Sequence, residues 1–354
     1  MPIPCPFSRV SVLLVLLAAP LQSAESTPAI KKPDPIDHGT FSFYFENDLF
    51  GGTDQRYTNG VRLSWTSPDL KKFSESAFTG PFGTQIDELP WINASAYQRN
   101  VAFVLGQSMF TPTDIQETEL IEDDRPYAGW LYTGLGFIWK NQHVRNALTL
   151  NIGVVGPSAY AQETQDFIHE LRDIPKARGW DNQLHDELGV VLGFQRMWRW
   201  PQHERRAGLD WEALPFIGAN LGNVRISASV GGEFRFGYNL PDDFGTETIG
   251  AAATTTTPME GGQRASRSRW TGFGTHLFVR AEGQAVARDI FLDGNTFGDS
   301  PSVDKLPFTA DLSAGLSVNY KDVKLTYAYV YRTEEFRGQD GGQSFGSLTL
   351  SIPF

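Results

Sequence analysis

Cysteine is almost absent from this chain of 354 residues. The single cysteine, Cys5, lies ahead of an apolar stretch at 10–21, which follows the basic Arg9 and is itself followed by small and polar residues up to Ala24. This order is typical of a secretory signal peptide cleaved after Ala24. We therefore expect residues 1–24 to be removed, and the exported chain to be held together by hydrogen bonds and not by disulfides.

Long apolar runs and surplus positive charge are missing as well. No stretch after the predicted signal peptide reaches the roughly eighteen consecutive apolar residues that a membrane-spanning helix needs. Without Arg9 the chain has 30 − 1 = 29 Lys and Arg against 41 Asp and Glu, a net charge of 29 − 41 = −12. The first absence excludes membrane insertion by apolar helices, and the second argues against a nucleic-acid partner.

The chain does contain apolar residues at every second position. Between 225 and 237 the even positions are mostly apolar, from Ile226 to Phe236, and the odd positions are mostly polar. A strand of this kind has one apolar and one wet face. A soluble sheet would give the same pattern, but the pattern recurs at 145–156, 323–334 and 345–354. This repetition predicts an all-β fold, a transmembrane antiparallel barrel in the outer membrane of a Gram-negative bacterium.

The same reading divides the chain into strands and connections. An N-terminal periplasmic segment at 25–39 precedes a barrel at 40–354, and connections 68–99 and 241–269 are long for periplasmic turns. Either connection is a flexible loop, or the strand count is wrong there. We predict twelve strands, an even number as bacterial barrels require: 40–47, 57–67, 100–108, 129–140, 145–156, 186–199, 209–219, 224–240, 270–287, 308–319, 323–334 and 345–354.

Strand parity predicts which connections face outward. With both termini periplasmic, odd-numbered strands rise to the outside and even-numbered strands return. The first, second, third and fifth external loops then lie at 47–57, 109–128, 157–185 and 288–307. These connections are the ones richest in polar motifs, so we expect any active site at the external mouth.

The first external loop, within FYFENDLFGGTDQRYTNG, carries a group of polar residues. Asn47 and Asp48 end one strand and Thr58 opens the next, so a hairpin places them side by side. An adjacent carboxylate and amide can hold a cation. They are equally common as plain turn residues.

The second external loop contains EDDRPYAGW, and we assign Arg125 of this loop a substrate-binding role. The neighbouring Asp123 and Asp124 are read as a solvated acidic face.

The third loop, GPSAYAQETQDFIHELRDI, is predicted to be a short helix over 159–173 with Ser158 as its N-cap. Its polar face includes Gln165 and His169, so we expect the histidine to be presented and not buried. A neutral imidazole can take a proton from water. Water, base and cation together would make a hydrolase, although the polar face can equally be the wet side of a surface helix. The opposite, apolar stripe consists of Phe167, Ile168, Leu171 and Ile174.

One further motif, the G-x-S-x-G pattern at 342–346, matches the nucleophile elbow of hydrolases. That elbow needs a helix after its serine. A terminal strand follows here, so we read the match as a coincidence.

Four ordered blocks resemble the lipid A 3′-O-deacylase family of outer-membrane barrels, the LpxR type: FENDLFGGTDQRYTNG, DRPYAGWLY, GPSAYAQETQDFIHEL and LDGNTFGDSPSVDK. The resemblance implies a twelve-stranded barrel whose site lies at the outer rim, between the wall and a helix of an external loop. It implies Ca²⁺-dependent hydrolysis of the 3′-linked acyloxyacyl chain of lipid A, the lipid anchor of lipopolysaccharide. A last strand ending in Phe354 also resembles the signal read by the barrel assembly machinery.

Carried over by position, the family's Asn–Asp pair falls on Asn47 and Asp48, its hydroxyl residue on Thr58 and its histidine on His169. His169 would be the general base, Asp48 with Asn47 would hold Ca²⁺, and Thr58 would support that geometry. Oxygen donors with a single nearby histidine and no cysteine suit Ca²⁺ better than zinc.

The pattern departs at the acid expected to hydrogen-bond the histidine, whose position is occupied by Pro175. Glu170, Asp173 or Asp181 are the alternatives. Two other functions stay open: an outer-membrane phospholipase, and a porin or adhesin without enzymatic activity.

Overall fold

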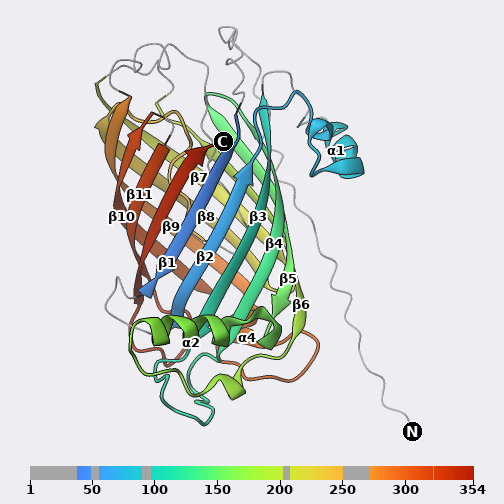
Figure 1. Cartoon of the computed structure of the whole chain (residues 1–354), viewed down its shortest axis with the longest axis vertical. Helices are drawn as coiled ribbons and strands as arrows, with labels where there is room; N and C mark the ends of the chain where they lie inside the picture. The colour runs from blue at the N-terminus through green and yellow to red at the C-terminus, as the bar shows by residue number, and fades with distance from the viewer. Residues whose placement is uncertain are drawn as a thin grey trace. The chain divides into compact units, whose positions relative to one another are not determined.

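The computed structural model describes residues 38–48, 56–89, 92, 97–201, 208–249, 272–321 and 323–354. The predicted signal peptide lies outside the described residues. Within these ranges, antiparallel strands follow one another in chain order and close into a barrel (Figure 1). The strands are β1 (Thr40–Asn47), β2 (Arg56–Thr66), β3 (Gln98–Thr111), β4 (Ala128–Lys140), β5 (Val144–Val155), β6 (Glu187–Trp198), β7 (Leu209–Gly222), β8 (Arg225–Tyr238), β9 (Phe273–Asp289), β10 (Phe308–Tyr320), β11 (Val323–Arg332) and β12 (Gln343–Pro353).

All twelve predicted strands are confirmed, and no end differs from its predicted position by more than three residues. The barrel closes because β1 pairs with β12, with Thr40 opposite Pro353. Beyond that pair, Gly39 and Phe354 exchange two backbone hydrogen bonds of 3.2 and 3.1 Å. We call this end of the barrel the terminal end. The wall therefore has no free strand edge, which is what a β structure in lipid requires.

The alternation read from β8 is the alternation of the folded strand. Val230 and Phe236 are exposed on the outside of the wall, whereas Glu233 and Arg235 are buried inside it. On β11, the alternate residues Leu325, Tyr327, Tyr329 and Tyr331 are likewise exposed. The outer surface is thus apolar and the lumen polar, as predicted for a membrane barrel.

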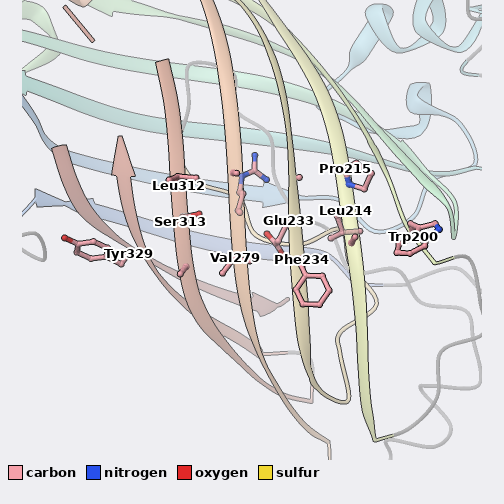
Figure 2. A pocket seen from close by; sticks show the side chains of 14 residues that line it. Trp200, Leu214, Pro215, Glu233, Phe234, Val279, Leu312, Ser313 and Tyr329 are labelled. Atoms are coloured by element: carbon pink, nitrogen blue, oxygen red, sulfur yellow. The ribbon is translucent and has the colours of Figure 1, made fainter. Parts of the chain in front are cut away.

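The apolar outer surface is hollowed over β7 to β11 (Figure 2). Small residues, including Gly232 and Ala281, line it together with larger exposed side chains such as Phe234, Leu312 and Tyr329. The lining is almost entirely apolar in its exposed part, which fits contact with lipid chains.

The lumen is filled in part by the beginning of the connection between β8 and β9. The segment from Leu240 to Ile249 enters the barrel from the terminal end and is buried along most of its length. The Glu247 carboxylate accepts from Arg145 of β5 at 2.8 Å, and the backbone N–H of Ile249 donates to Glu46 of β1 at 2.8 Å. The strand count was therefore right. The first part of this connection is a luminal plug and not the flexible loop that was one expectation.

An ionic cluster around Asp243 anchors the plug. Its carboxylate contacts Arg235 at 2.5 Å and Lys324 at 2.7 Å, and its carbonyl accepts from Arg199. Burial alone would raise the pKa of the Asp243 carboxyl, but the charges of Lys324 and Arg235 outweigh burial and hold that pKa well below its ordinary value. The plug is thus fixed at its base by a fully paired buried charge.

The other long connection, between β2 and β3, packs outside the wall. It contains η2 (Phe73–Glu75) and α1 (Gly80–Asp87). The Phe73 side chain is buried against Val101 and Phe137, which face outward from β3 and β4. The remaining short helices lie at the opposite end of the barrel, which we call the helix end (Figure 1): η3 (Pro157–Ala159), α2 (Ala161–Leu171), η4 (Trp180–Asn182) and α4 (Ile290–Asp293). In the described part of the chain, no helix is long and apolar enough to cross a membrane.

The Asp243 cluster predicts a stability difference. Asp243→Asn leaves Arg235 and Lys324 without their shared carboxylate, so we expect the free energy of unfolding to fall by roughly 3–5 kcal/mol. Because the Asp243 pKa is lowered in the folded protein, the difference should be constant above the unfolded pKa of about 3.9 and shrink as pH falls below it.

Urea unfolding in detergent micelles over a pH series measures this difference. Asp304→Asn is the matched control, because Asp304 pairs with Arg337 on the surface, where both side chains are mostly exposed. Equal stability of the wild type and the Asp243 variant at neutral pH would show that the cluster does not hold the plug.

Candidate active site

The hairpin of β1 and β2 brings the predicted residues of the first loop together at the helix end. Asn47 ends β1, and its side-chain amide donates to the backbone carbonyl of Thr58 at 3.1 Å. Asp48 follows and is fully buried. The predicted proximity of these three residues is therefore confirmed.

Thr58 occupies a β-bulge. Along the β2–β3 pair the register shifts between Tyr57 and Asn59, so Thr58 is the extra residue. Bulges re-aim side chains and are frequent beside active sites. Here the Thr58 hydroxyl is directed to the hydroxyl of Thr111, the last residue of β3, with an O···O distance of 2.8 Å.

Thr111 was missed in the sequence. It lies at the edge of the second external loop, and no motif marks it. Strand parity could have placed Thr111 on the same face as Asn47. The residues that fall on the outward side of their strands are Asn47, Asn59, Met109 and Thr111.

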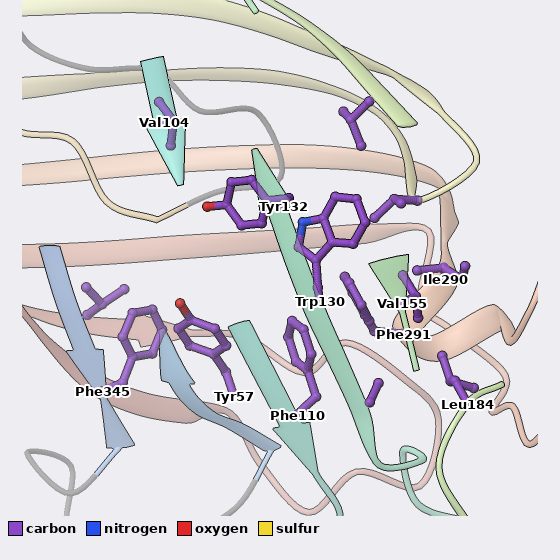
Figure 3. Packing of buried hydrophobic residues seen from close by; sticks show 14 of the residues in the cluster. Tyr57, Val104, Phe110, Trp130, Tyr132, Val155, Leu184, Ile290, Phe291 and Phe345 are labelled. Carbon is purple, nitrogen blue, oxygen red and sulfur yellow. The ribbon is translucent and has the colours of Figure 1, made fainter. Parts of the chain in front are cut away.

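The bulge is supported from the lumen (Figure 3). The ring of Tyr57 points inward, packs against Phe110 and Phe345, and donates its hydroxyl to Glu46 at 2.8 Å. The other oxygen of Glu46 accepts from Ser347 and from the N–H of Ile249 in the plug. The strand ends that carry Asn47 and Thr58 are thereby connected across the wall to the luminal plug.

Gln343, inside the G-x-S-x-G pattern, also supports the bulge. Its side-chain amide accepts from the N–H of Tyr57 at 3.1 Å and donates to the carbonyl of Tyr57 at 3.0 Å. These two bonds replace strand pairing where β1 has already ended. The pattern opens β12 directly, which agrees with reading it as a structural coincidence.

Helix α2 lies against the outside of the wall. Its start is seated on β4, where a Cβ added to Gly129 would lie 2.6 Å from the Ala161 Cβ. Gln107 of β3 donates to the carbonyl of Ala159 at 2.7 Å. The predicted helix is confirmed, but its predicted N-cap is wrong: Tyr160 precedes the helix, while Ser158 bonds Asp186 instead.

The orientation of α2 is opposite to the expected one. Phe167 and Leu171 are 64% and 73% exposed, whereas Gln165 and His169 are buried, with His169 only 3% exposed. The prediction that the histidine is presented to solvent was wrong. It assumed water around the helix, but Gln165 and His169 are buried and bond Trp180 and Pro175 of the same loop, whereas Phe167 and Leu171 point outward. Ile168 and Ile174 of the predicted apolar stripe are half-buried.

Gln165 is the second buried polar residue of this face. Its side-chain oxygen accepts from the indole N–H of Trp180 at 2.8 Å, and Trp180 packs on Tyr127. The Gln165 amide nitrogen is also buried and has no hydrogen-bond partner among the described residues. Gln165 is therefore a candidate polar group of the site that was noted in the sequence only as part of a polar face.

The partner of the histidine ring is a backbone carbonyl. Nδ1 of His169 lies 2.6 Å from the carbonyl oxygen of Pro175. A carbonyl only accepts, so Nδ1 carries a proton, and in the neutral ring the lone pair is then on Nε2. Pro175, which occupies the position where an acid was expected, thus still orients the ring through its backbone carbonyl. Glu170, Asp173 and Asp181 do not take this place at Nδ1.

Strand register relates α2 to the hairpin. Gly129, Met109, Asn59 and Asn47 are paired in succession from β4 to β1, so they form one row across the outer wall. α2 contacts β4 and β3. From its seat at β4, eight residues of helix cover about 12 Å, or two to three strand spacings of about 4.8 Å. The stretch of α2 from this seat to His169 is therefore as long as two to three strands are wide.

Arg125 lies elsewhere. Its guanidinium is buried over the Phe110 ring and pairs with Glu335 at 3.2 Å. This pair ties the second external loop to the sixth, which is the connection 333–342 between β11 and β12. The substrate-binding role assigned to Arg125 stays a prediction that this placement does not support.

The fourth block, LDGNTFGDSPSVDK, forms a loop contact. Glu187 of β6 accepts from the side chain of Asn295 and from the N–H of Thr296. Asn295 also exchanges two hydrogen bonds with the backbone of His185. These hydrogen bonds hold the third external loop, which contains α2, to the fifth external loop.

The oxygen donors at the hairpin fit a hard cation better than a transition metal. No cluster of three or more His, Cys, Asp or Glu that could hold a metal exists among the described residues. What the site offers is the Asp48 carboxylate, the Asn47 amide oxygen and two threonine hydroxyls. This set suits Ca²⁺ completed by backbone carbonyls and water.

Comparison with known proteins gave one family. The family described as outer membrane protein LpxR matches residues 10–354. The chain is similar in structure to LpxR from Salmonella typhimurium, at 18% sequence identity and a TM-score of 0.70, covering 89% of this chain and 100% of that chain. It is more distantly similar to the β domain of the Bordetella autotransporter BrkA, at 11% identity and a TM-score of 0.39, covering 90% and 98%. No curated protein matches the chain.

The His169 contact predicts a tautomer that can be observed directly. In protein labelled with ¹⁵N-histidine, one neutral ring should show a protonated Nδ1 and an unprotonated Nε2, because Pro175 accepts from Nδ1. The spectrum of His169→Gln identifies the signal among the chain's six histidines. A signal from His169 with the proton on Nε2 would contradict the contact.

Proposed function

The chain belongs to the family of outer membrane protein LpxR and lies in the outer membrane, and on that premise we propose that it hydrolyses the ester that links the 3′ acyloxyacyl chain to lipid A. The observation that carries this proposal is the position of the candidate site. His169, Thr58, Asn47 and Asp48 lie on the outward side of the wall or under a helix packed on it, and not in the lumen.

A site on the outer wall favours a lipid substrate. A lipid diffuses in the plane of the membrane and meets the barrel from the side, at the level where the apolar belt meets the polar rim. With both termini periplasmic, the helix end faces outward. The lipid of that leaflet is lipid A, so the site meets it without any passage through the barrel.

His169 supplies the base of the proposed reaction. With its proton on Nδ1, the ring presents the Nε2 lone pair to a water. Nε2 takes one proton as the water oxygen attacks the ester carbonyl carbon. The bond to the sugar oxygen then breaks, the same proton passes to that oxygen, and the products are a free acid and a sugar hydroxyl.

The hydroxyl pair supplies a donor to the developing oxyanion. Thr58 and Thr111 share one hydrogen bond, and two hydroxyls carry two protons, so one O–H can be donated to the ester oxygen. Asn47 holds the bulge at Thr58 through its bond to the Thr58 carbonyl. These contacts position the donor before the substrate arrives.

We propose Ca²⁺ as the cofactor, held by Asp48 and the Asn47 side-chain oxygen. When bound, the ion supplies positive charge that polarises the ester carbonyl. Asp48 is fully buried at the end of β1, a setting in which an ionised carboxylate needs compensating positive charge or donors. One carboxylate is a small ligand charge for Ca²⁺, so we expect weak affinity.

The lumen argues against the porin alternative. The buried plug and its ion pairs with Arg145, Arg235 and Lys324 fill part of the barrel interior. Such a filled lumen does not favour passive conductance. The phospholipase alternative shares the chemistry and is separated by substrate, so purified protein should be offered lipid A and phospholipid in parallel.

His169→Gln should lower turnover of lipid A by about 10²–10⁴-fold, because it removes the base. Pro175→Ala should keep most of the activity, since the carbonyl that accepts from His169 belongs to the main chain. Fatty-acid release in detergent micelles measures both, with heat-modifiable gel migration as the control for folding. Full activity of His169→Gln would refute the base, and release from phospholipid alone would favour the phospholipase.

Chelation of calcium should abolish release, and Asp48→Ala should raise the calcium concentration needed for half-maximal activity, because the carboxylate is the proposed charged ligand. Asp181→Ala, a change at an exposed acid on η4 at the same end, is the matched control. Activity that is unchanged in excess chelator would overturn the calcium proposal and leave the histidine role untouched.

A further inference from the structure

The exposed side of α2 points away from the barrel and carries apolar side chains. Phe167 and Leu171 are one helical turn apart, 64% and 73% exposed, and Tyr160 at the helix start is 60% exposed. A helix at the mouth of a barrel in water would bury this stripe. We propose that α2 is an interfacial helix whose outer face lies among the acyl chains of the adjacent membrane leaflet.

Strand register relates the helix to the apolar outer surface of the wall. Leu188, Val154, Leu131 and Gln107 are paired in succession from β6 to β3, so they form one row on the outer surface. Leu188 in this row is 67% exposed, as a lipid-facing residue is. Gln107 of the same row donates to the carbonyl of Ala159, immediately before α2.

The helix is seated one step above this row, at Gly129. Successive outward residues of a strand are about 7 Å apart along the strand, so the start of α2 lies next to the outward-facing Leu131 of β4, at the border of the apolar belt. The belt and the exposed stripe of α2 are therefore continuous. This continuity identifies the occupant as lipid chains, because the belt itself faces lipid.

The two faces of α2 fit that border. Ala161, Gln165 and His169 recur every four residues on the buried face of the helix, and Ala161 rests on Gly129 of the wall. Phe167 and Leu171 project on the opposite side, flanked by the exposed acids Glu163 and Glu170. Amphipathic helices with this arrangement lie with the apolar face about 5–10 Å into the boundary between headgroups and acyl chains.

The inference has a consequence for access to the site. A helix lying in the leaflet border separates its buried face from bulk water, so the space between α2 and the wall opens to the membrane and not to the medium. The inference itself rests on burial and register, and it stands whether or not the site hydrolyses lipid A.

Site-directed spin labelling tests the position of α2. After removal of the predicted signal peptide the chain has no cysteine, so single cysteines can be introduced at Phe167, Leu171 and Glu170 in a Cys5→Ser background. The labelled proteins are reconstituted into phosphatidylethanolamine–phosphatidylglycerol vesicles. Collision of each nitroxide with oxygen, which partitions into the bilayer, is compared with collision with a water-soluble nickel chelate.

Two further labels calibrate the measurement. Leu312→Cys lies on the exposed apolar wall, and Asp304→Cys replaces a mostly exposed loop carboxylate. We expect the oxygen-to-nickel ratio at 167 and 171 to approach the ratio at 312, and the ratio at 170 to stay near that at 304. Heat-modifiable migration of each labelled protein confirms the fold.

Ratios at 167 and 171 equal to that at 304 would overturn the proposal, because they would place the stripe in water. Low collision rates with both reagents would overturn it too, because they would mean that protein, such as a second copy of the chain, covers the stripe. If the labels place α2 among lipid chains but the protein does not hydrolyse lipid A, only the proposed function is contradicted.

Discussion

Pairing of every backbone hydrogen-bonding group in the wall is the constraint from which the rest of the structure follows. Lipid offers no partner to a backbone N–H or carbonyl, so β1 must meet β12 and the chain must close. Closure gives each strand one face toward lipid and one toward the lumen. Polar side chains on the outer wall are then tolerable only at its rim, which is where Asn47, Thr58 and Thr111 lie.

The lumen gives this rim its rigidity. The Glu46 carboxylate of β1 accepts hydrogen bonds from Tyr57 of β2, from Ser347 of β12 and from Ile249 of the plug. One buried carboxylate thus joins three neighbouring wall strands to the plug. Tyr57, next to the bulge at Thr58, has no partner on β1, because that strand ends at Asn47. The side chain of Gln343 bonds the Tyr57 backbone instead. The polar interior thus supports, from the lumen, a site that faces outward.

Strand parity and local pattern predicted the wall and the hairpin, because alternation and neighbouring strand ends are local properties. The plug was not predictable, since its burial depends on partners as distant as Glu46 and Ile249. Thr111 has no motif, and the Pro175 carbonyl has no side-chain signature. The face of α2 was misassigned because amphipathicity indicates which face is apolar but not whether the surroundings are water or lipid.

The central claim is that this barrel removes an ester-linked acyl group from lipid A, and the mass spectrum of lipid A tests it most directly. Lipid A from cells that express the wild type, grown with calcium, should lose the mass of the 3′ acyloxyacyl group, and cells that express folded His169→Gln should keep it. An identical spectrum in both, with the wild-type protein folded in the outer membrane, would contradict the account.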